Sequence, residues 1–414
     1  MNTRRVPATS DLWWAAIIAV AWLCKCWLGL WIADHCESAA AWHYLCADIG
    51  PWAEFLGRAQ HGIPYIDFPR EYPVGIGTLF WGLGALFGAR DLATTLRLQV
   101  DLALVGDLVC AALLYIAAKP TSRATAGIVA VASLWLPSAL VLSPFRYESV
   151  VGAVVLLGYL AYRRGRWAWA VGIWSLGITL KWYPVIAIAI QELRALDEPD
   201  YWRRRFLRVL VVAAAVQLAI NGPYLIGGLL AHGNVDHWIE TYTFHANRRL
   251  GPDTVLGVFA LWLGPSSIEH WASGFSMALA AVVLWTRRNM AFEPKFVLVC
   301  ASLLVMNRVY SPQFNLWFMP FLLLTLAAQS GARRAWLAVP TLAIDFTTVA
   351  IFPFLYAIVV VELGGGLPWG GMAAVGGRFS ELFTSAVFIR AFALLALMAG
   401  IYRVCGEEQA RDAG

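Results

Sequence analysis

The sequence predicts an all-α polytopic membrane protein. Of its 414 residues, 60% are hydrophobic and only 14% are charged, and the mean hydropathy is +0.64, whereas soluble domains carry about 25% charged residues. Apolar runs long enough to cross a hydrocarbon core of about 30 Å recur along the whole chain. We therefore expect a single integral-membrane domain, 1–414, with no second soluble domain between the spans.

Hydropathy predicts twelve membrane spans. They are 11–33, 98–118, 125–143, 149–163, 167–181, 182–196, 206–228, 266–286, 294–307, 311–329, 334–359 and 385–404. Two further apolar segments, 73–88 and 254–264, are shorter and are flanked by Gly or Pro. No small-residue cleavage pattern follows the first run, so we interpret it as a retained span and not as a signal peptide.

Clusters of basic residues fix the predicted topology, because cytoplasmic loops carry an excess of Lys and Arg. If both short apolar segments stay on the outer side, all of these clusters face inward: Arg4/Arg5, Lys119/Arg123, Arg163/Arg164/Arg166, Arg203/Arg204/Arg205/Arg208, Arg287/Arg288, Arg333/Arg334 and Arg403. We therefore predict that both termini are cytoplasmic and that 73–88 forms an interfacial or re-entrant helix. The net charge of +5 reflects these topology signals, so we expect no nucleic-acid partner.

Polar residues of both signs gather in the loops that this topology places outside. The first outer loop, 34–97, and the second, 231–265, carry acids, bases and histidine, whereas the inner loops are short and basic. A reaction or binding centre is therefore expected at the outer membrane boundary.

Asp48 is the first candidate for chemistry. A carboxylate held at the lipid–water boundary can act as a general base, taking a proton from an acceptor hydroxyl that attacks a sugar's anomeric carbon. The alternative is that Asp48 caps a short helix beginning at Pro51, since Pro favours the first helical turn. The spacing alone leaves both open.

Glu71 and Tyr72 lie where the first outer loop turns into the apolar segment 73–88. Glu71 is a candidate to anchor a donor, to orient Asp48 or to pair with a nearby Arg, and the alternative is a solvated loop acid. Tyr72 is more simply explained as an interfacial aromatic residue.

Three cations at the outer ends of spans are candidate anion contacts: Lys181 in TLKWYPV, Arg146 in SPFRYES and Arg308 in NRVYSPQF. Outer cations run against the topology bias, and a cation beside a helix break can hold a lipid phosphate. For Lys181 the alternative is a side chain that snorkels to the interface.

Asp107 lies about nine residues into its predicted span. An ionisable group in hydrocarbon is costly and marks a functional site by default. Asp107 therefore needs a partner such as Lys25 or Arg146, and the pair is either functional or purely structural. In TYTFHANRRLGPD, His245, Arg248 and Arg249 either bind a phosphate or belong to an ordinary basic loop.

The seven cysteines contain no CxxC pair and no histidine at metal-binding spacing. Only Cys36 and Cys46 share a polar loop, where they either form a disulfide or remain two thiols. No P-loop, GxGxxG, GxSxG or HExxH pattern is present, so nucleotide-driven transport and the common hydrolase mechanisms have no support.

Several stretches together resemble the GT-C superfamily of integral-membrane glycosyltransferases, in particular glycosyltransferase family 87. Asp48-Ile-Gly-Pro-Trp52 followed by GIPYIDFPREYPVG is similar to the family pattern D-x-x-x-Y, then G-x-P-Y-x-D-F-x-x-E-Y-P-P-G. SPFRYES, TLKWYPV, RRLGPDTVLG and VYSPQFNLWFMPFLLL resemble later family segments, in the expected order over about residues 42–400. VGDLVCAALLY resembles the segment with a buried Asp in a related eukaryotic branch.

The resemblance implies an inverting transfer from a lipid-phosphate sugar. It implies Asp48 as the general base and Glu71 in the donor-side loop, beside Tyr72. The candidate phosphate contacts are Arg146, Lys181 and Arg308, with His245 and Arg248 on the donor side, and Asp107, Glu148 and Gln313 are supporting residues. Such enzymes generally need no nucleotide or essential metal. Three positions depart from the family pattern: Trp52 stands for Tyr, Val74 for the second Pro, and Glu148 for Asp.

The expected function is therefore transfer of a sugar, with mannose as the first expectation, from polyprenyl phosphate to a lipid-linked or glycan acceptor. The expected place is the outer face of a bacterial inner membrane, among membrane lipids. A polyprenyl-phosphate arabinofuranose or other pentose donor is compatible with the same residues. The alternatives from other classes are a secondary transporter or lipid flippase, which predicts internal repeats and a charged path through both faces, and an inactive homologue that scaffolds envelope assembly.

Overall fold

The computed structural model describes residues 9–47, 49–198, 200–246, 251, 253–263, 268–286, 288–358 and 378–412. Within these ranges the regular elements are helices, apart from one isolated bridge between Pro64 and Phe68. The α-helices are α1 (Thr9–Asp34), α2 (Ala40–Ala47), α3 (Gly50–Arg58), α4 (Val74–Phe87), α5 (Leu92–Ala118), α6 (Arg123–Trp135), α7 (Pro137–Val141), α8 (Glu148–Arg163), α9 (Trp167–Leu180), α10 (Val185–Ala195), α11 (Leu207–His232), α12 (Asp236–Ala246), α13 (Val255–Leu263), α14 (Ile268–Thr286), α15 (Phe292–Val305), α16 (Asn315–Ala328), α17 (Gly331–Val349) and α19 (Arg378–Asp412). Short 3-10 segments are η1 (Ser143–Phe145) and η3 (Pro312–Phe314), and π-helical segments are η2 (Tyr201–Phe206) and η4 (Ala350–Leu355).

Five of the described helical segments are long and apolar enough to cross a membrane. They are Ser10–Asp34, Leu92–Ala118, Leu207–His232, Gly331–Ile358 and Glu381–Cys405. Large apolar side chains such as Trp13, Trp27 and Leu230 point outward from these helices, where lipid would cover them. The chain is therefore a helical membrane protein, as the composition predicts, while the count of twelve spans remains a prediction.

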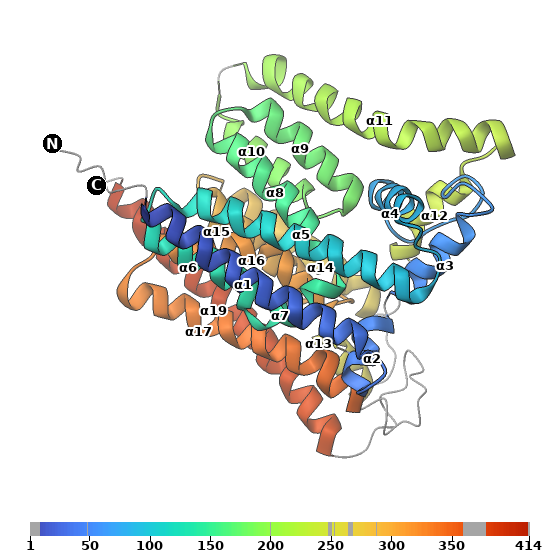
Figure 1. Ribbon diagram of the computed structural model, residues 1–414. Coiled ribbons are helices and arrows are strands. Elements are labelled where there is room, and N and C mark those ends of the chain that lie inside the picture. The colour runs from blue at the N-terminus through green and yellow to red at the C-terminus, as the bar shows by residue number, and fades with distance from the viewer. Residues whose placement is uncertain are drawn as a thin grey trace.

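The long helices lie side by side along one axis, so the bundle has two ends (Figure 1). α1 begins and α19 ends at the same end, which agrees with the prediction that both termini share one side. The short helices α2, α3, α4 and α12 gather at the opposite end, which we call the loop end. The two predicted outer loops thus contribute elements to one end of the molecule.

Two predicted spans differ from the helices in ways that affect the loops next to them. The span 125–143 is interrupted at Leu136, which is extended (φ −57°, ψ 143°). The cause is Pro137, because a proline disfavours the α conformation in the residue that precedes it. Asp345 of α17 accepts hydrogen bonds from the backbone N–H and the hydroxyl of Ser138 and so satisfies the start of α7. The span 98–118 begins earlier, at Leu92.

Asp91 explains the early start of α5. Its side chain accepts the backbone N–H of Thr94 at 2.8 Å in a capping box, which satisfies a free donor at the helix start. The first outer loop is therefore shorter than the predicted 34–97. The hydrogen bonds from Thr94 also keep the pKa of Asp91 below its usual value, so the cap stays charged at neutral pH.

Helix α4 occupies the short apolar segment predicted to stay on one side. Its 14 residues would span about 21 Å, less than a hydrocarbon core of about 30 Å. The start of α4 lies directly against the end of α9, because a Cβ added at Gly75 would come within 2.8 Å of Thr179 side-chain and backbone atoms. A glycine here allows the approach that brings the first outer loop onto the α9–α10 turn.

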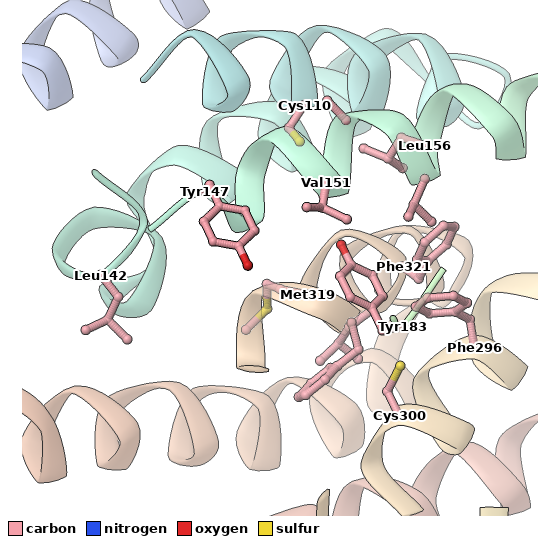
Figure 2. Close-up of a cluster of buried hydrophobic side chains, with 14 of the residues drawn as sticks. Cys110, Leu142, Tyr147, Val151, Leu156, Tyr183, Phe296, Cys300, Met319 and Phe321 are labelled. Carbon is pink, nitrogen blue, oxygen red and sulfur yellow. The ribbon is translucent and has the colours of Figure 1, made fainter. Parts of the chain in front are cut away.

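A large apolar core joins α5, α8, α15 and α16 (Figure 2). Val151 and Leu156 of α8 face Met319 and Phe321 of α16, and Phe296 of α15 completes the layer. All five side chains are buried. This core holds the start of α8 in a fixed position relative to α16 at the loop end.

Candidate functional site

A narrow, partly open pocket lies at the loop end of the bundle, with a cavity volume of about 20 Å³. Helices α3 and α5, the turn before α8, the α9–α10 turn and η3 all contribute to its wall. The lining residues are Ile49, Trp52, Tyr72, Gln99, Phe145, Arg146, Tyr147, Glu148, Lys181 and Gln313. Five residues that the sequence singled out, Tyr72, Arg146, Glu148, Lys181 and Gln313, thus come together, although they lie as much as 241 positions apart in the chain.

Lys181 and Glu148 form an ion pair in this pocket. Helix α9 ends at Leu180, Lys181 is extended, and Pro184 starts the next helix, so the lysine leaves the helix and its side chain turns inward. Glu148 is the first residue of α8 and is 1% exposed, at the helix end whose dipole favours negative charge. The structure therefore buries Lys181 against a carboxylate, and Lys181 does not snorkel to a surface.

Aromatic rings surround the ammonium of Lys181. Its Nζ lies 4.7 Å from the ring centre of Tyr147 and 5.8 Å from that of Trp317, distances at which a cation is attracted to a π face. Trp317 stacks in turn on Tyr183, with ring centres 4.8 Å apart. Figure 2 shows the phenol groups of Tyr147 and Tyr183 directed into the space between α8 and α16. Burial keeps the pKa of Tyr147 well above its usual value, so this phenol stays neutral.

Trp52 forms the aromatic wall on the other side. Its ring stacks on Tyr72 at 4.9 Å and on Phe80 at 4.2 Å. The guanidinium of Arg70 lies 4.8 Å from the Trp52 ring centre, and its Nε and Nη2 are buried with no hydrogen-bond partner among the described residues. Tyr72 thus belongs to the pocket wall and is more than an interfacial aromatic residue.

Several pocket side chains carry polar atoms that are buried without a hydrogen-bond partner in the described part of the chain. These atoms are Oε2 of Glu148, Oε1 of Gln99, Oε1 of Gln313 and the hydroxyl of Tyr147. Unpaired buried polar atoms are rare in native proteins and call for an explanation. Carboxylate, amide and phenol oxygens all accept hydrogen bonds, so this set is suited to a ligand rich in hydroxyl groups.

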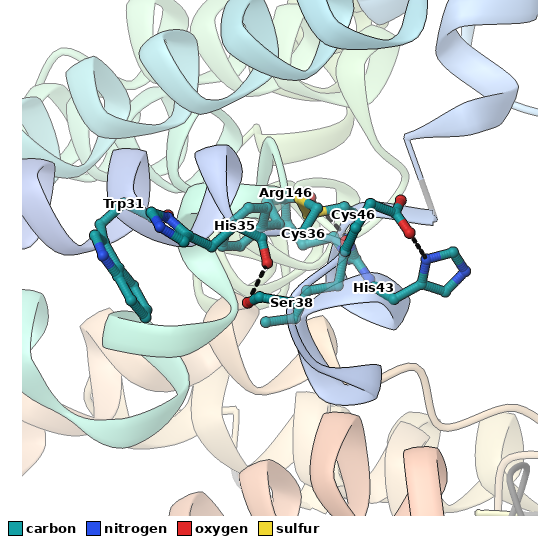
Figure 3. The surroundings of a disulfide bond; sticks show 10 residues. Trp31, His35, Cys36, Ser38, His43, Cys46 and Arg146 are labelled. Carbon is teal, nitrogen blue, oxygen red and sulfur yellow. Dashed lines mark hydrogen bonds and ion pairs between the residues drawn. A yellow bond between two sulfur atoms is a disulfide. The ribbon is translucent and has the colours of Figure 1, made fainter.

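Arg146 joins the pocket to the first outer loop. Its Nη1 donates to the carbonyl of Phe145 at 2.8 Å and approaches the carbonyl of Leu45 in α2 at 3.5 Å. A disulfide links Cys36 to Cys46, the residue after Leu45, with Cα atoms 6.1 Å apart (Figure 3). Of the two alternatives for these cysteines the structure therefore has the disulfide, which closes the loop that carries α2.

Asp107 pairs with Lys25, the first of the two partners considered, at 2.7 Å. The other carboxylate oxygen accepts the hydroxyl of Ser143 at 2.5 Å. Ser143 begins η1, the turn that leads to Arg146. The ion pair inside the bundle therefore supports the pocket wall indirectly, through Ser143. Lys25 is fully buried and Asp107 is 5% exposed.

The remaining predicted site residues either fall outside the described residues or are not among those that line the pocket. Asp48, Arg248 and Arg249 fall outside the described residues, as does the side chain of His245, whose backbone belongs to the last turn of α12. Helix α3 does begin at Gly50 with a proline in its first turn, but its N-cap is Ile49. Arg308 and Glu71 are half-buried and do not line the pocket.

Asp67 and Tyr65 fix the polar stretch before α4. Asp67 accepts the backbone N–H of Ile63 at 2.6 Å and contacts Nε2 of His232 at 3.1 Å, and the hydroxyl of Tyr65 donates to the carbonyl of Tyr72 at 3.0 Å. The hydrogen bonds to Ile63 and His232 hold the pKa of Asp67 below its usual value. These contacts tie the first outer loop to the end of α11.

Sequence reasoning missed three residues of interest. Gln99 lines the pocket and Trp317 covers Lys181, but a glutamine or tryptophan in an apolar run carries no signal of its own. Arg390 is a different case: it lies inside a predicted span and is 2% exposed, and the rule that flagged Asp107 would have flagged it too.

Among the described residues, no three His, Cys, Asp or Glu side chains cluster as metal ligands. The described residues that line the pocket supply cations, aromatic rings and hydrogen-bonding groups. In comparisons with known proteins, no family model matches this chain and no curated sequence matches it.

Proposed function

We propose that this protein is a membrane glycosyltransferase of the GT-C type that moves a sugar from a polyprenyl-phosphate donor to a lipid-linked or glycan acceptor. The observation that supports the proposal best is the pocket at the loop end. Tyr72, Arg146, Glu148, Lys181 and Gln313 come from separate segments and line it together.

The chemistry of the pocket suits a sugar beside a phosphate. Trp52 and Tyr72 offer flat apolar faces of the kind that cover a sugar ring, and unpaired oxygens of Glu148, Gln99 and Gln313 can accept its hydroxyl protons. Lys181 and Arg146 add positive charge at the same rim.

The proposed reaction is a single inverting displacement. The acceptor oxygen forms a bond to the anomeric carbon while the bond from that carbon to the phosphate oxygen breaks, and the electron pair leaves with the lipid phosphate. Asp48 takes the proton of the acceptor hydroxyl. Ile49, the next residue in the chain, lines the pocket, which is consistent with a base at this rim.

Arg146 and Lys181 would stabilise the charge that develops on the departing phosphate. Glu148 holds the Lys181 ammonium in the pocket through an ion pair, so the cation is positioned before the donor arrives. Preorganised charge of this kind costs no rearrangement at the moment of reaction.

The proposed setting is the outer face of a bacterial inner membrane, with twelve spans and both termini inside. An outer site uses lipid-carried sugars, because nucleotide sugars remain in the cytosol. Mannose is the first donor to test, and arabinofuranose is the second.

Sugar transfer by the purified protein tests the proposal. The protein in proteoliposomes would be given radiolabelled polyprenyl-phosphate mannose or arabinofuranose with a lipid extract as acceptor. We expect labelled glycolipid from one donor, and a loss of about 10²–10⁴-fold in Asp48→Asn. The control is Asp34→Asn, an exposed acid of the same outer loop.

Full activity in Asp48→Asn would remove the assigned base. No transfer from any donor in the panel, together with movement of solute or lipid across the vesicle membrane, would replace the enzyme with a transporter or flippase. A protein that shows neither sugar transfer nor flux would instead favour the inactive scaffold.

A further inference from the structure

Arg390 is a buried arginine in the apolar part of α19, in contact with two loops. Its Nη2 donates to the carbonyl oxygen of Asp253, and its guanidinium also lies 3.9 Å from the Asp253 carboxylate. The guanidinium carbon is 3.8 Å from the ring centre of Tyr310. One side chain thus contacts the second outer loop and the loop between α15 and α16.

Tyr310 is linked by hydrogen bonds to α16 and, through Asn315, to α17. Its hydroxyl donates to Oδ1 of Asn315 at 2.5 Å, and Nδ2 of Asn315 donates to the hydroxyl of Thr348 in α17 at 2.7 Å. Burial raises the pKa of Tyr310 to about 12, so the phenol keeps the proton that it donates. The loop that holds Arg308, Tyr310 and Gln313 is therefore anchored at its centre.

The second outer loop is anchored at the same place. The backbone N–H of Gly251 donates to the carbonyl of Arg308 at 2.7 Å, and the hydroxyl of Thr254 accepts the N–H of Gly257 at 2.9 Å at the start of α13. Val258 of α13 packs in one apolar cluster with Val387 of α19. Gly251 directly follows the basic segment that contains Arg248.

These contacts need the shape of arginine and not its charge alone. A guanidinium is planar and presents a fork of donors, so it can donate to Asp253 and lie over Tyr310 at once, whereas the compact ammonium of lysine cannot do both. A cation that served only to balance charge would not need this geometry.

We propose that Arg390 is a positioning residue that joins the second outer loop to the loop carrying Arg308 and Gln313, and so sets how the lipid-phosphate donor is held. The inference rests on the proposed function. Arg390 contacts none of the pocket-lining residues in the interactions described above, and it acts through Tyr310 and Asp253.

Donor and acceptor titrations separate this role from a general structural one. In Arg390→Lys we expect the KM for the polyprenyl-phosphate sugar to rise about tenfold, equivalent to one hydrogen-bonded contact, while kcat stays within about twofold and the acceptor KM is unchanged. Tyr310→Leu should raise the donor KM by the same factor. The double variant should have no higher a donor KM than either single variant, because both substitutions remove the same contact.

The matched control is Arg334→Lys. Arg334 also donates to backbone carbonyl oxygens, including that of Gln329 at 2.8 Å, but it lies at the start of α17, away from the loop end. It should leave the donor KM unchanged. If Arg390→Lys lowers kcat alone, or keeps the wild-type donor KM, the positioning role is wrong.

Hydrogen–deuterium exchange tests the same contact without any assay of transfer. Arg390→Lys should speed exchange in 253–263 and 306–315, and should leave 40–47 in α2 unchanged. Unchanged exchange in the first two segments overturns the inference. Faster exchange there, in a protein that transfers no sugar even as wild type, supports the contact and contradicts the proposed function.

Discussion

The two buried lysine–carboxylate pairs of this protein differ in what surrounds them. Lys25 and Asp107 lie between α1 and α5, and the second oxygen of Asp107 is occupied by Ser143. Lys181 and Glu148 lie at the loop end, where the second oxygen of Glu148 has no hydrogen-bond partner among the described residues and the pair lines a pocket. The closed pair lies away from the pocket and acts on it at most through Ser143, whereas the open pair can meet a ligand directly.

A buried charge pair is costly to break whether or not it has a function. Removing one partner of a buried pair leaves the other uncompensated, whatever the pair is for. Burial alone therefore does not separate structure from function. The free acceptor atom and the neighbouring pocket do, and both belong to Glu148 and not to Asp107.

The largest effect should come from Lys25→Met. It leaves the Asp107 carboxylate buried without its partner, so we expect a loss of about 3–5 kcal/mol in the free energy of unfolding. Thermal unfolding followed by tryptophan fluorescence measures it. The double variant Lys25→Met/Asp107→Leu should recover most of the loss. An unchanged melting temperature in Lys25→Met would show that the pair carries no stability.

Glu148→Gln should lower transfer by about 100-fold, equivalent to about 2.7 kcal/mol, because Lys181 is no longer held in place and a pocket acceptor is lost. Its effect on the melting temperature should be smaller than that of Lys25→Met, since Lys181 can be hydrated from the pocket. The measurement is the initial rate of glycolipid formation. Wild-type rates would mean that the open pair is only structural.

The disulfide provides a third test of the pocket wall. Closing a loop of about ten residues is worth about 2.7 kcal/mol in the chain-entropy model, so Cys36→Ser/Cys46→Ser should unfold at a lower temperature. Because Arg146 approaches the carbonyl of Leu45 beside this bridge, transfer should fall as well. Cys24→Ser, an exposed free thiol, is the control. Equal melting temperatures in both variants would contradict a stabilising role.

The smallest effect concerns Asp67. Its folded pKa lies below the usual 3.8 because Ile63 and His232 bond to the charged form. The charged carboxylate therefore makes its full contribution to the free energy of unfolding above pH 3.8. That contribution is lost as the pH falls through the lower pKa of the folded state. The melting temperature of wild type should exceed that of Asp67→Asn by a constant small margin at neutral pH, and the margin should shrink below about pH 4. If the difference in melting temperature persisted to the lowest pH, it could not come from the charge of the carboxylate.

Composition and hydropathy predicted the helical membrane fold, since apolar length and basic clusters are local properties of the chain. The KWYP motif similarly predicted the helix break that turns Lys181 inward, because proline acts on its immediate neighbours. Ionisable residues inside apolar runs predicted that Asp107 would need a partner, and Lys25 is that partner.

The sequence could not show which distant residues meet. Gln99 and Gln313 acquire meaning only because α5 and η3 reach the same pocket, and the pairing of Lys181 with Glu148 depends on how α8 and α9 pack. The interruption at Pro137 was missed because apolar residues continue on both sides of it, although the proline itself was a local signal. Arg390 was missed although its setting is the same as that of Asp107.

The most direct test of the contrast between the two pairs is the same substitution at each lysine, Lys25→Met and Lys181→Met, with sugar transfer measured per folded molecule. The folded fraction would be measured by size-exclusion chromatography and thermal unfolding. We expect Lys25→Met to lose stability and to keep transfer per folded molecule within about twofold of wild type. Lys181→Met should lose about 100-fold in transfer with the smaller loss of stability. Equal transfer by the folded molecules of both variants would contradict the assignment of the open pair to function.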